Sequence, residues 1–153
     1  MIAQNFSYKE LKAKAIYFLS RREYTYLELS SKLNKYTTDQ TLIKQLLDEL
    51  VKRNYLSNQR YIEAYLHAKA KRYGILKLKA NLMPKLDSYS EAEVALKELY
   101  EQQFKFAYEI WDKKFGVNPQ TKKEYLKQVR FLQNRGFTID VIKKIVTSKE
   151  IEL

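Results

Sequence analysis

Basic side chains are the residues of this sequence best suited to bind a ligand. The stretch from residue 64 to residue 86 contains no Asp or Glu. Among 153 residues, 29 Lys and Arg outnumber 18 Asp and Glu by 11, and more than half of that excess lies in this stretch. Such a cluster attracts the phosphates of nucleic acids regardless of base sequence. The alternative is a solvated face in a chain whose gene composition favours Lys. The six cations are Lys69, Lys71, Arg72, Lys77, Lys79 and Lys85.

The sequence offers little for catalysis or for metal binding. Its single histidine, His67, has no second His nearby, and the chain contains no Cys. The pairs Asp48/Glu49 and Glu91/Glu93 are adjacent or two residues apart, so their carboxylates do not converge on one helical face. Three Gly are too few for a glycine-rich phosphate loop of the nucleotide-binding type. We therefore expect a protein that is not an enzyme and that requires no cofactor or metal.

Composition indicates a folded helical protein. Hydrophobic residues make up 45% and charged residues 31%, and only three Gly and two Pro interrupt the chain. No stretch approaches the 18 apolar residues that a membrane span requires, and the first ten residues lack the apolar run of a signal peptide. We expect a cytoplasmic monomer that does not bind membranes.

An internal repeat organises the chain. Residues 15–33 align with residues 64–82 at an offset of 49, and residues 128–146 form a weaker third copy. A repeat of this length is typical of small modules in an array, where each module buries its apolar face against its neighbours. Equivalent positions in the alignment include Leu29 and Leu78, Leu33 and Leu82, and the aromatic set Tyr24, Tyr73 and Phe137.

Helical patterns fill each repeat. Apolar residues recur at spacings of three and four, and Ser or Thr followed three residues later by Glu marks several helix starts. We expect helices at about 8–22, 26–34, 39–54, 58–72, 75–86, 91–115, 121–135 and 139–149. The predicted fold is all-α, an elongated tandem array of three-helix, helix-turn-helix-like modules. We place the modules at 1–56, 57–116 and 117–153, with the third truncated.

Four segments resemble successive signatures of the RecX family of regulatory proteins, in the family's order and spacing. They are RREYTYLEL (21–29), NYLSNQRYIEAYL (54–66), RYG-x-x-KL (72–78) and FLQNRGF (131–137), and the resemblance covers nearly the whole chain. Ser57-Asn58 stands where the family usually has acidic residues, a departure that we expect to weaken a helix cap or a charged pair.

The resemblance implies both an architecture and a function. Proteins of this family are tandem arrays of three-helix modules. They bind the RecA recombinase, above all its filament on single-stranded DNA, and inhibit its ATPase, recombinase and coprotease activities. They thereby modulate DNA repair, recombination and the SOS response. They also bind single- and double-stranded DNA directly, which we expect here without preference for base sequence.

The predicted contacts to DNA or RecA combine the basic stretch with cations of the matching motifs and of the third repeat. They are Arg21, Arg22, Arg60, Lys69, Lys71, Arg72, Lys77, Lys79, Lys85, Arg130, Arg135, Lys143 and Lys144.

Several motif residues are expected to serve the fold instead. The aromatic set should fill the space between paired helices, with base stacking as the alternative. Gly74 and Gly136 should permit turns with positive φ. Arg60 stands at a helix start, where a cation opposes the helix dipole, so it needs either a partner acid or an interface.

Two other functions remain open on the residues alone. One is a helix-turn-helix transcriptional regulator that reads base sequence. The predicted recognition helices are short, and Lys is more frequent than the Arg, Asn or Gln that contact base edges, so both features disfavour it. The other is an all-helical protein–protein adaptor whose positive charge is incidental.

Overall fold

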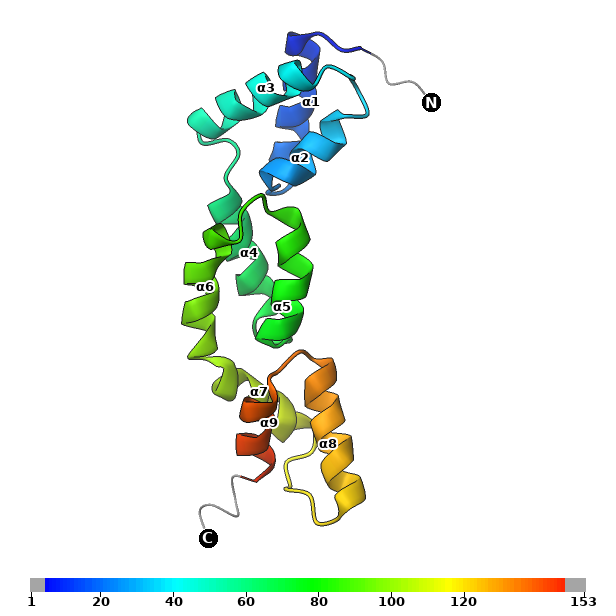
Figure 1. The fold of residues 1–153 in the computed structure, drawn as a ribbon, viewed down its shortest axis with the longest axis vertical. Helices are drawn as coiled ribbons and strands as arrows, with labels where there is room; N and C mark the ends of the chain where they lie inside the picture. Colours follow the sequence, from blue (N-terminus) through cyan, green and yellow to red (C-terminus); the bar gives the residue numbers. More distant parts are fainter. Residues whose placement is uncertain (1–4, 148–153) are drawn as a thin grey trace. The chain divides into compact units, whose positions relative to one another are not determined.

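The computed structural model describes residues 5–147, which form nine α-helices, one short 3-10 segment and no strand (Figure 1). The all-α prediction is confirmed. The helices are α1 (Tyr8–Arg21), α2 (Tyr26–Leu33), α3 (Gln40–Lys52), α4 (Asn58–Lys69), α5 (Ile75–Leu82), α6 (Ser90–Tyr100), α7 (Gln103–Lys114), α8 (Lys122–Asn134) and α9 (Ile139–Val146). The 3-10 segment Met83–Lys85 contains Pro84, so this proline ends the run of α5 as its missing N–H predicts.

The contacts divide the chain into two compact units. The first contains the described residues up to Ala64 together with Pro84–Glu91. The second contains Tyr65–Met83 and the described residues from Ala92 onward. Among residues 5–147, no helix combines the length and the apolar character needed to cross a bilayer.

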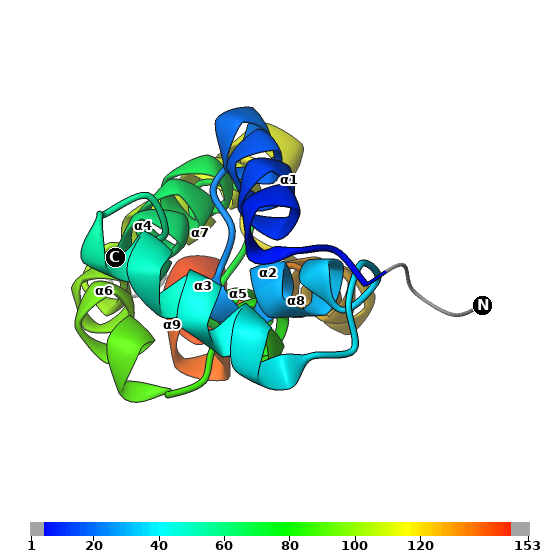
Figure 2. The ribbon, with the colours of Figure 1, turned by 90° about the horizontal axis from the view of Figure 1, so that it is seen from above.

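Helices α1, α2 and α3 surround the core of the first unit (Figure 1 and Figure 2). Capping boxes start α1 at Ser7/Glu10 and α2 at Thr25/Glu28, as the sequence predicts. The apolar stripe of α3 then faces the other two helices, since its inward residues are almost completely buried. The core contains Leu11, Ala15, Leu29, Leu33, Ile43, Leu46, Leu47 and Leu50.

The sequence repeat is visible in the short helices. Helices α2, α5 and α9 each have eight residues, and their N-caps Thr25, Gly74 and Thr138 occupy equivalent positions of the alignment. Each helix also buries the same two positions, which are filled by Leu29 and Leu33, Leu78 and Leu82, and Ile142 and Val146. The three copies therefore share local structure as well as sequence.

A second repeated feature caps two of these short helices, α2 and α5, with side chains that are distant in the chain. The Tyr26 N–H donates to Asn58 Oδ1 at 2.8 Å, and Asn58 is the first residue of α4. The equivalent Ile75 N–H donates to Gln103 Oε1 at 2.8 Å, and Gln103 is the first residue of α7. Unsatisfied amides at a helix start need such partners. Asn58 thus supports the start of α2, and Ser57 Oγ accepts the Arg60 N–H at 3.2 Å at the start of α4. That Ser57-Asn58 weakens a cap or a charged pair relative to acidic residues stays a prediction.

The expected helix at 91–115 is two helices. Helix α6 ends at Tyr100 and α7 begins at Gln103. The break lets the Gln103 side chain, which is 1% exposed, turn inward to accept the Ile75 N–H. Helix α7 contacts α8 and α9, so these three helices form a group of their own. The residue boundaries of the modules stay a prediction.

Candidate nucleic-acid interface

Positive charge is concentrated in the second unit. The second unit contains 17 Lys and Arg and nine Asp and Glu, which gives a net charge of +8. The first unit contains twelve Lys and Arg and nine Asp and Glu, which gives a net charge of +3. The second unit is therefore the better candidate for binding a polyanion, and two neighbouring clefts there are lined by cations from several elements.

The first of these, the α7 cleft, has a volume of about 520 Å³. The turn after α4 contributes Lys71 and Arg72, while α7 and the end of α8 supply the remaining lining. The lining contains five cations and a single acid, Glu109. The full lining is Lys71, Arg72, Glu109, Ile110, Lys113, Lys114, Phe131 and Arg135.

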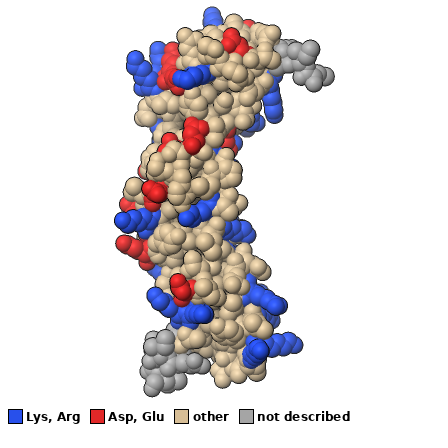
Figure 3. Space-filling view, viewed as in Figure 1, with Lys and Arg blue, Asp and Glu red and all other residues tan. Residues whose placement is uncertain are grey.

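The adjoining α8 cleft has a volume of about 530 Å³ and no acid in its lining. Three of its cations, Lys123, Lys127 and Arg130, follow one face of α8 at spacings of four and three residues. Lys and Arg side chains project from the edge of the protein that carries α8 (Figure 3). Its lining is Lys114, Phe115, Lys123, Leu126, Lys127, Arg130, Phe131 and Asn134, so Lys114 and Phe131 belong to both clefts.

Aromatic rings order the cations where the clefts meet. Phe131 packs edge-on against Phe115 with their ring centroids 5.4 Å apart. Lys114 Nζ lies 5.6 Å and Arg135 Cζ 5.4 Å from the Phe131 centroid, within the range of cation–π attraction. Both cations thereby lie against the same ring, and Lys114 is exposed to solvent.

An end-to-end junction of α5 and α8 builds one wall of the α7 cleft. The Gly74 N–H donates to the Arg135 carbonyl at 2.6 Å, and the Leu76 N–H donates to the Gly136 carbonyl at 3.0 Å. Arg135 also donates from its guanidinium to the Arg72 carbonyl at 3.1 Å. Free amides at the start of α5 thus satisfy free carbonyls at the end of α8 (Figure 1). Lys71 and Arg72 are fixed beside α8 as a result.

The two glycines of this junction serve different needs. Gly136 has a φ of +95°, as predicted. Gly74 has a φ of −78°, so the prediction of a positive φ there is wrong. Its glycine is required by proximity, because a Cβ at Gly74 would overlap the backbone of Gly136 and Phe137.

The structure separates the predicted site residues of the second unit. Lys71, Arg72, Arg130 and Arg135 line the two clefts. The Lys77 ammonium contacts the Asn134 carbonyl at 3.4 Å and lies 4.8 Å from the Tyr73 ring, so it serves the junction. Lys69 and Lys79 are half-buried, while Lys143 and Lys144 are exposed on α9 and line neither cleft.

The predicted site residues of the first unit lie in a different setting. Arg21, Arg22 and Arg60 line a third cleft, and Glu23 accepts a hydrogen bond from Arg60 at 2.8 Å. Lys85 contacts the Tyr61 hydroxyl at 3.0 Å. Most of these cations therefore have polar partners within the protein.

Four cleft cations escaped the sequence analysis. Lys113, Lys114, Lys123 and Lys127 lie among acids in the chain, unlike the acid-free stretch at 64–86. For Lys123 and Lys127 the signal was their helical spacing with the predicted Arg130, which places all three on one face of α8.

The aromatic residues of the motifs mostly support packing. Tyr24 is 6% exposed and Phe137 1% exposed, so the prediction that they fill space between helices is confirmed. Trp111 is also buried, and its indole N–H donates to Gln128 Oε1 at 2.8 Å. Among residues 5–147, no three His, Cys, Asp or Glu side chains gather where they could hold a metal ion.

Comparison with known proteins decides the family. A family model described as the third three-helix domain of RecX matches residues 100–146, which include α7, α8 and α9. The regulatory protein RecX of Leptothrix cholodnii is 32% identical over 145 residues, covering 95% of this chain and 92% of the relative. The chain belongs to the RecX family. The RecX protein of Ralstonia nicotianae is 37% identical over 140 residues, covering 89% and 86%.

Solved RecX structures share the fold. The crystal structure of RecX from Lactobacillus salivarius matches with a TM-score of 0.81 over 94% of this chain and 97% of that chain, at 20% identity. Most of the α7 and α8 clefts thus lies within the third three-helix domain of a RecX regulatory protein. Only Lys71 and Arg72 precede that domain.

Proposed function

We propose that this RecX protein binds the RecA recombinase, above all its filament on single-stranded DNA, and inhibits the filament's ATPase, recombinase and coprotease activities. Its action modulates DNA repair, recombination and the SOS response. Membership of a family of regulatory proteins supports this proposal. The observation that carries its nucleic-acid part is the pair of adjoining clefts that share Lys114 and gather eight cations against a single acid.

Nucleic acid binds these clefts through its phosphates, in single- or double-stranded form. Lys ammonium groups act as mobile point charges that suit phosphate oxygens in many positions. Arg135 is already committed to the Arg72 carbonyl, which limits its use in reading a base edge. Binding should therefore depend strongly on salt and little on base sequence.

Inhibition of ATP hydrolysis acts on the partner. The sequence lacks a glycine-rich phosphate loop, so hydrolysis belongs to RecA. Several contact surfaces on one chain increase the effective concentration of each for its target once another is bound. Contacts to adjacent RecA subunits and to the DNA they coat would hold those subunits in one arrangement.

The deciding experiment titrates this protein into RecA filaments preassembled on single-stranded DNA and follows ATP hydrolysis. We expect hydrolysis to fall as the protein approaches stoichiometry with its filament sites. A filament whose hydrolysis stays constant at that concentration would contradict the proposal. Binding to bare oligonucleotides of two unrelated sequences is measured in parallel. Equal affinities are expected, whereas a strong preference for one sequence would support a base-reading regulator.

A further inference from the structure

The first unit contains the most spacious of the clefts described here, at about 580 Å³. We name it the α1 cleft. Ile16, Leu19 and Tyr55 are its large apolar lining residues, and its charged lining includes Arg21, Glu23 and Arg60. It differs from the two clefts of the second unit, whose linings contain five and four cations and at most one acid.

The apolar part of this cleft is accessible to a partner. Tyr55 is 51% exposed and Ile16 42% exposed. Exposed large apolar side chains gathered around a hollow with a polar rim are typical of protein-binding surfaces. Tyr and Arg are also the residue types that contribute most often to binding energy at such surfaces.

The opposite wall is held in place by Arg60. Its Nε donates to Glu23 Oε2 at 2.8 Å, one terminal nitrogen donates to Asn54 Oδ1 at 2.9 Å, and the other donates to the Tyr55 carbonyl at 3.2 Å. This answers why a cation stands at the start of α4, because Glu23 compensates its charge. The side chain fixes the loop that carries Tyr55 and uses a donor on each of its three nitrogens within the protein.

The charge of the rim resides mainly in Arg21. Arg22 contacts Glu28 at 3.4 Å and Arg60 contacts Glu23 at 2.8 Å. Among residues 5–147, Arg21 has no ion pair, and its guanidinium lies 5.9 Å from the Tyr17 ring. One unpaired cation beside an apolar hollow suits a single carboxylate next to an apolar side chain better than it suits a chain of phosphates.

We propose that the α1 cleft is the surface that docks RecA, through a segment that presents an apolar side chain to Ile16 and Tyr55 and a carboxylate to Arg21. The inference rests on the proposed function and assigns the protein contact to the first unit. The nucleic-acid contact belongs to the clefts of the second unit. The protein contact then uses an apolar surface with one unpaired cation, and the nucleic-acid contact uses clustered cations.

The test measures two properties of the same full-length variants. Tyr55→Ala and Arg21→Ala are assayed for inhibition of ATP hydrolysis by RecA filaments and for binding to bare single-stranded DNA. We expect the concentration needed for inhibition to rise about tenfold for each, the size of effect seen for interface anchors. Affinity for bare DNA should stay within about twofold of the wild type.

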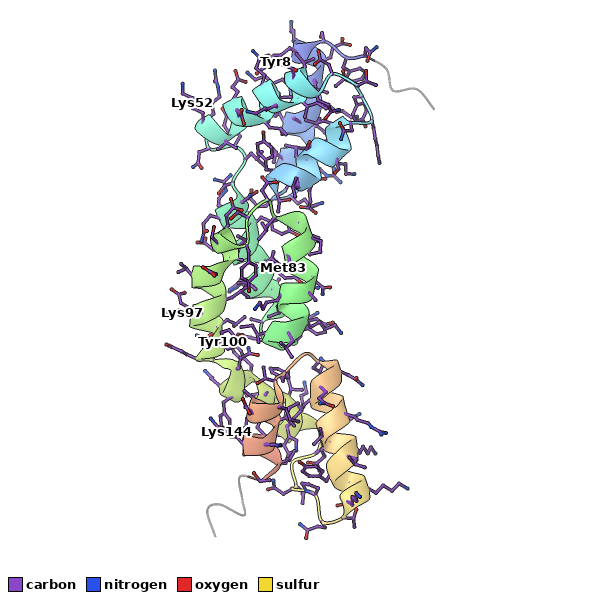
Figure 4. The ribbon with its side chains drawn as sticks, in the orientation of Figure 1. Tyr8, Lys52, Met83, Lys97, Tyr100 and Lys144 are labelled. Atoms are coloured by element: carbon purple, nitrogen blue, oxygen red, sulfur yellow. The ribbon has the colours of Figure 1, made fainter. Side chains whose placement is uncertain are left out.

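Matched controls test whether exposure or charge alone has these effects. Tyr100 is 49% exposed, close to Tyr55, and lies on α6 of the second unit (Figure 4). Lys52 is an exposed cation at the end of α3 and does not line the α1 cleft (Figure 4). Tyr100→Ala and Lys52→Ala should inhibit like the wild type. Equal losses in these controls would overturn the inference.

Three outcomes separate the possibilities. Cleft variants that inhibit like the wild type would overturn the docking surface and leave the proposed function standing. Cleft variants that lose bare-DNA binding in parallel would make the cleft a nucleic-acid contact and also overturn it. A wild-type protein without effect on RecA overturns the proposed function and the inference with it.

A photoreactive phenylalanine derivative introduced at position 55 supplies a readout that does not depend on truncating a side chain. Its position is half-exposed, so the folded protein can accommodate it. We expect cross-links to RecA subunits of the filament. Cross-links to DNA alone would contradict the docking surface.

Discussion

The hydroxyl of Tyr26 on α2 donates to Asp48 Oδ1 on α3 at 2.9 Å. Burial, together with the hydrogen bond to Asp48 and the nearby carboxylate charge, raises the pKa of Tyr26 to about 12. Lys44 contacts the same carboxylate at 2.7 Å, and together with Tyr26 it lowers the pKa of Asp48. A proton on Tyr26 thus links two helices of the first unit.

This link predicts an alkaline limit to stability. The pKa of Tyr26 is above its ordinary value of 10.0 only in the folded protein, so its contribution is complete below pH 10 and is lost as the pH rises toward about 12. Urea unfolding of wild type and Tyr26→Phe between pH 9 and pH 12 measures it. The difference in unfolding free energy between the two proteins should shrink with rising pH. A difference that stays constant would show that the Tyr26 proton is not linked to folding.

Arg60 and Gly74 show which structural roles of single residues cannot be predicted from the sequence alone. The sequence left Arg60 with two readings, a partner acid or an interface. Its partner Glu23 is 37 residues away, and nothing local identifies it. Gly74 was assigned a positive φ because glycine is the residue that adopts one most easily. Glycine also permits close contact between backbones, and only the folded chain shows which property is used.

At the scale of elements, local patterns predicted most of the fold. Capping boxes and the repeat alignment predicted the starts of α1, α2 and α5, since these signals act within a few residues. The break between α6 and α7 carries no Gly or Pro. The break depends on the hydrogen bond between the Ile75 N–H and the buried Gln103 side chain, 28 residues away in the chain. Because no local signal marks this contact, the sequence predicted one long helix.

The junction of α5 and α8 can be tested with two glycines. Gly136 and Gly116 both have positive φ, but a Cβ at Gly136 would overlap Lys77 whereas one at Gly116 would only approach the Asp112 carbonyl. We expect Gly116→Ala to cost about 1 kcal/mol from backbone strain alone. Gly136→Ala should cost clearly more, about 2–4 kcal/mol, because strain and overlap add. Equal losses in denaturant unfolding would indicate that the junction yields easily.

At the scale of the whole molecule, the important feature is the unequal division of charge. The acid-free stretch at 64–86 is visible in the sequence, but two of its cations make contacts within the protein. Lys77 contacts the α5–α8 junction, and Lys85 contacts the Tyr61 hydroxyl. The cations of α7 and α8 were hidden because acids separate them in the chain, although folding places them along two clefts.

This division predicts unequal effects of equal charge changes. The double variant Lys123→Ala/Lys127→Ala and the control Lys9→Ala/Lys52→Ala each remove two exposed cations. The first should reduce the log–log salt slope of single-stranded DNA binding by about 1.4, roughly 0.7 for each lost phosphate contact. The control should leave the slope near the wild-type value. If both variants reduce it equally, net charge rather than the clefts governs binding.

The α5–α8 junction also imposes an order on synthesis. Arg72 and its partner Arg135 are 63 residues apart, so a ribosome that adds about 5–20 residues per second makes the second roughly 3–12 s after the first. An eight-residue helix such as α5 is marginal alone. During that interval the Gly74 and Leu76 N–H groups at its start lack the carbonyl groups that later accept them. The middle repeat therefore acquires these cap partners only when the last third of the chain has been made.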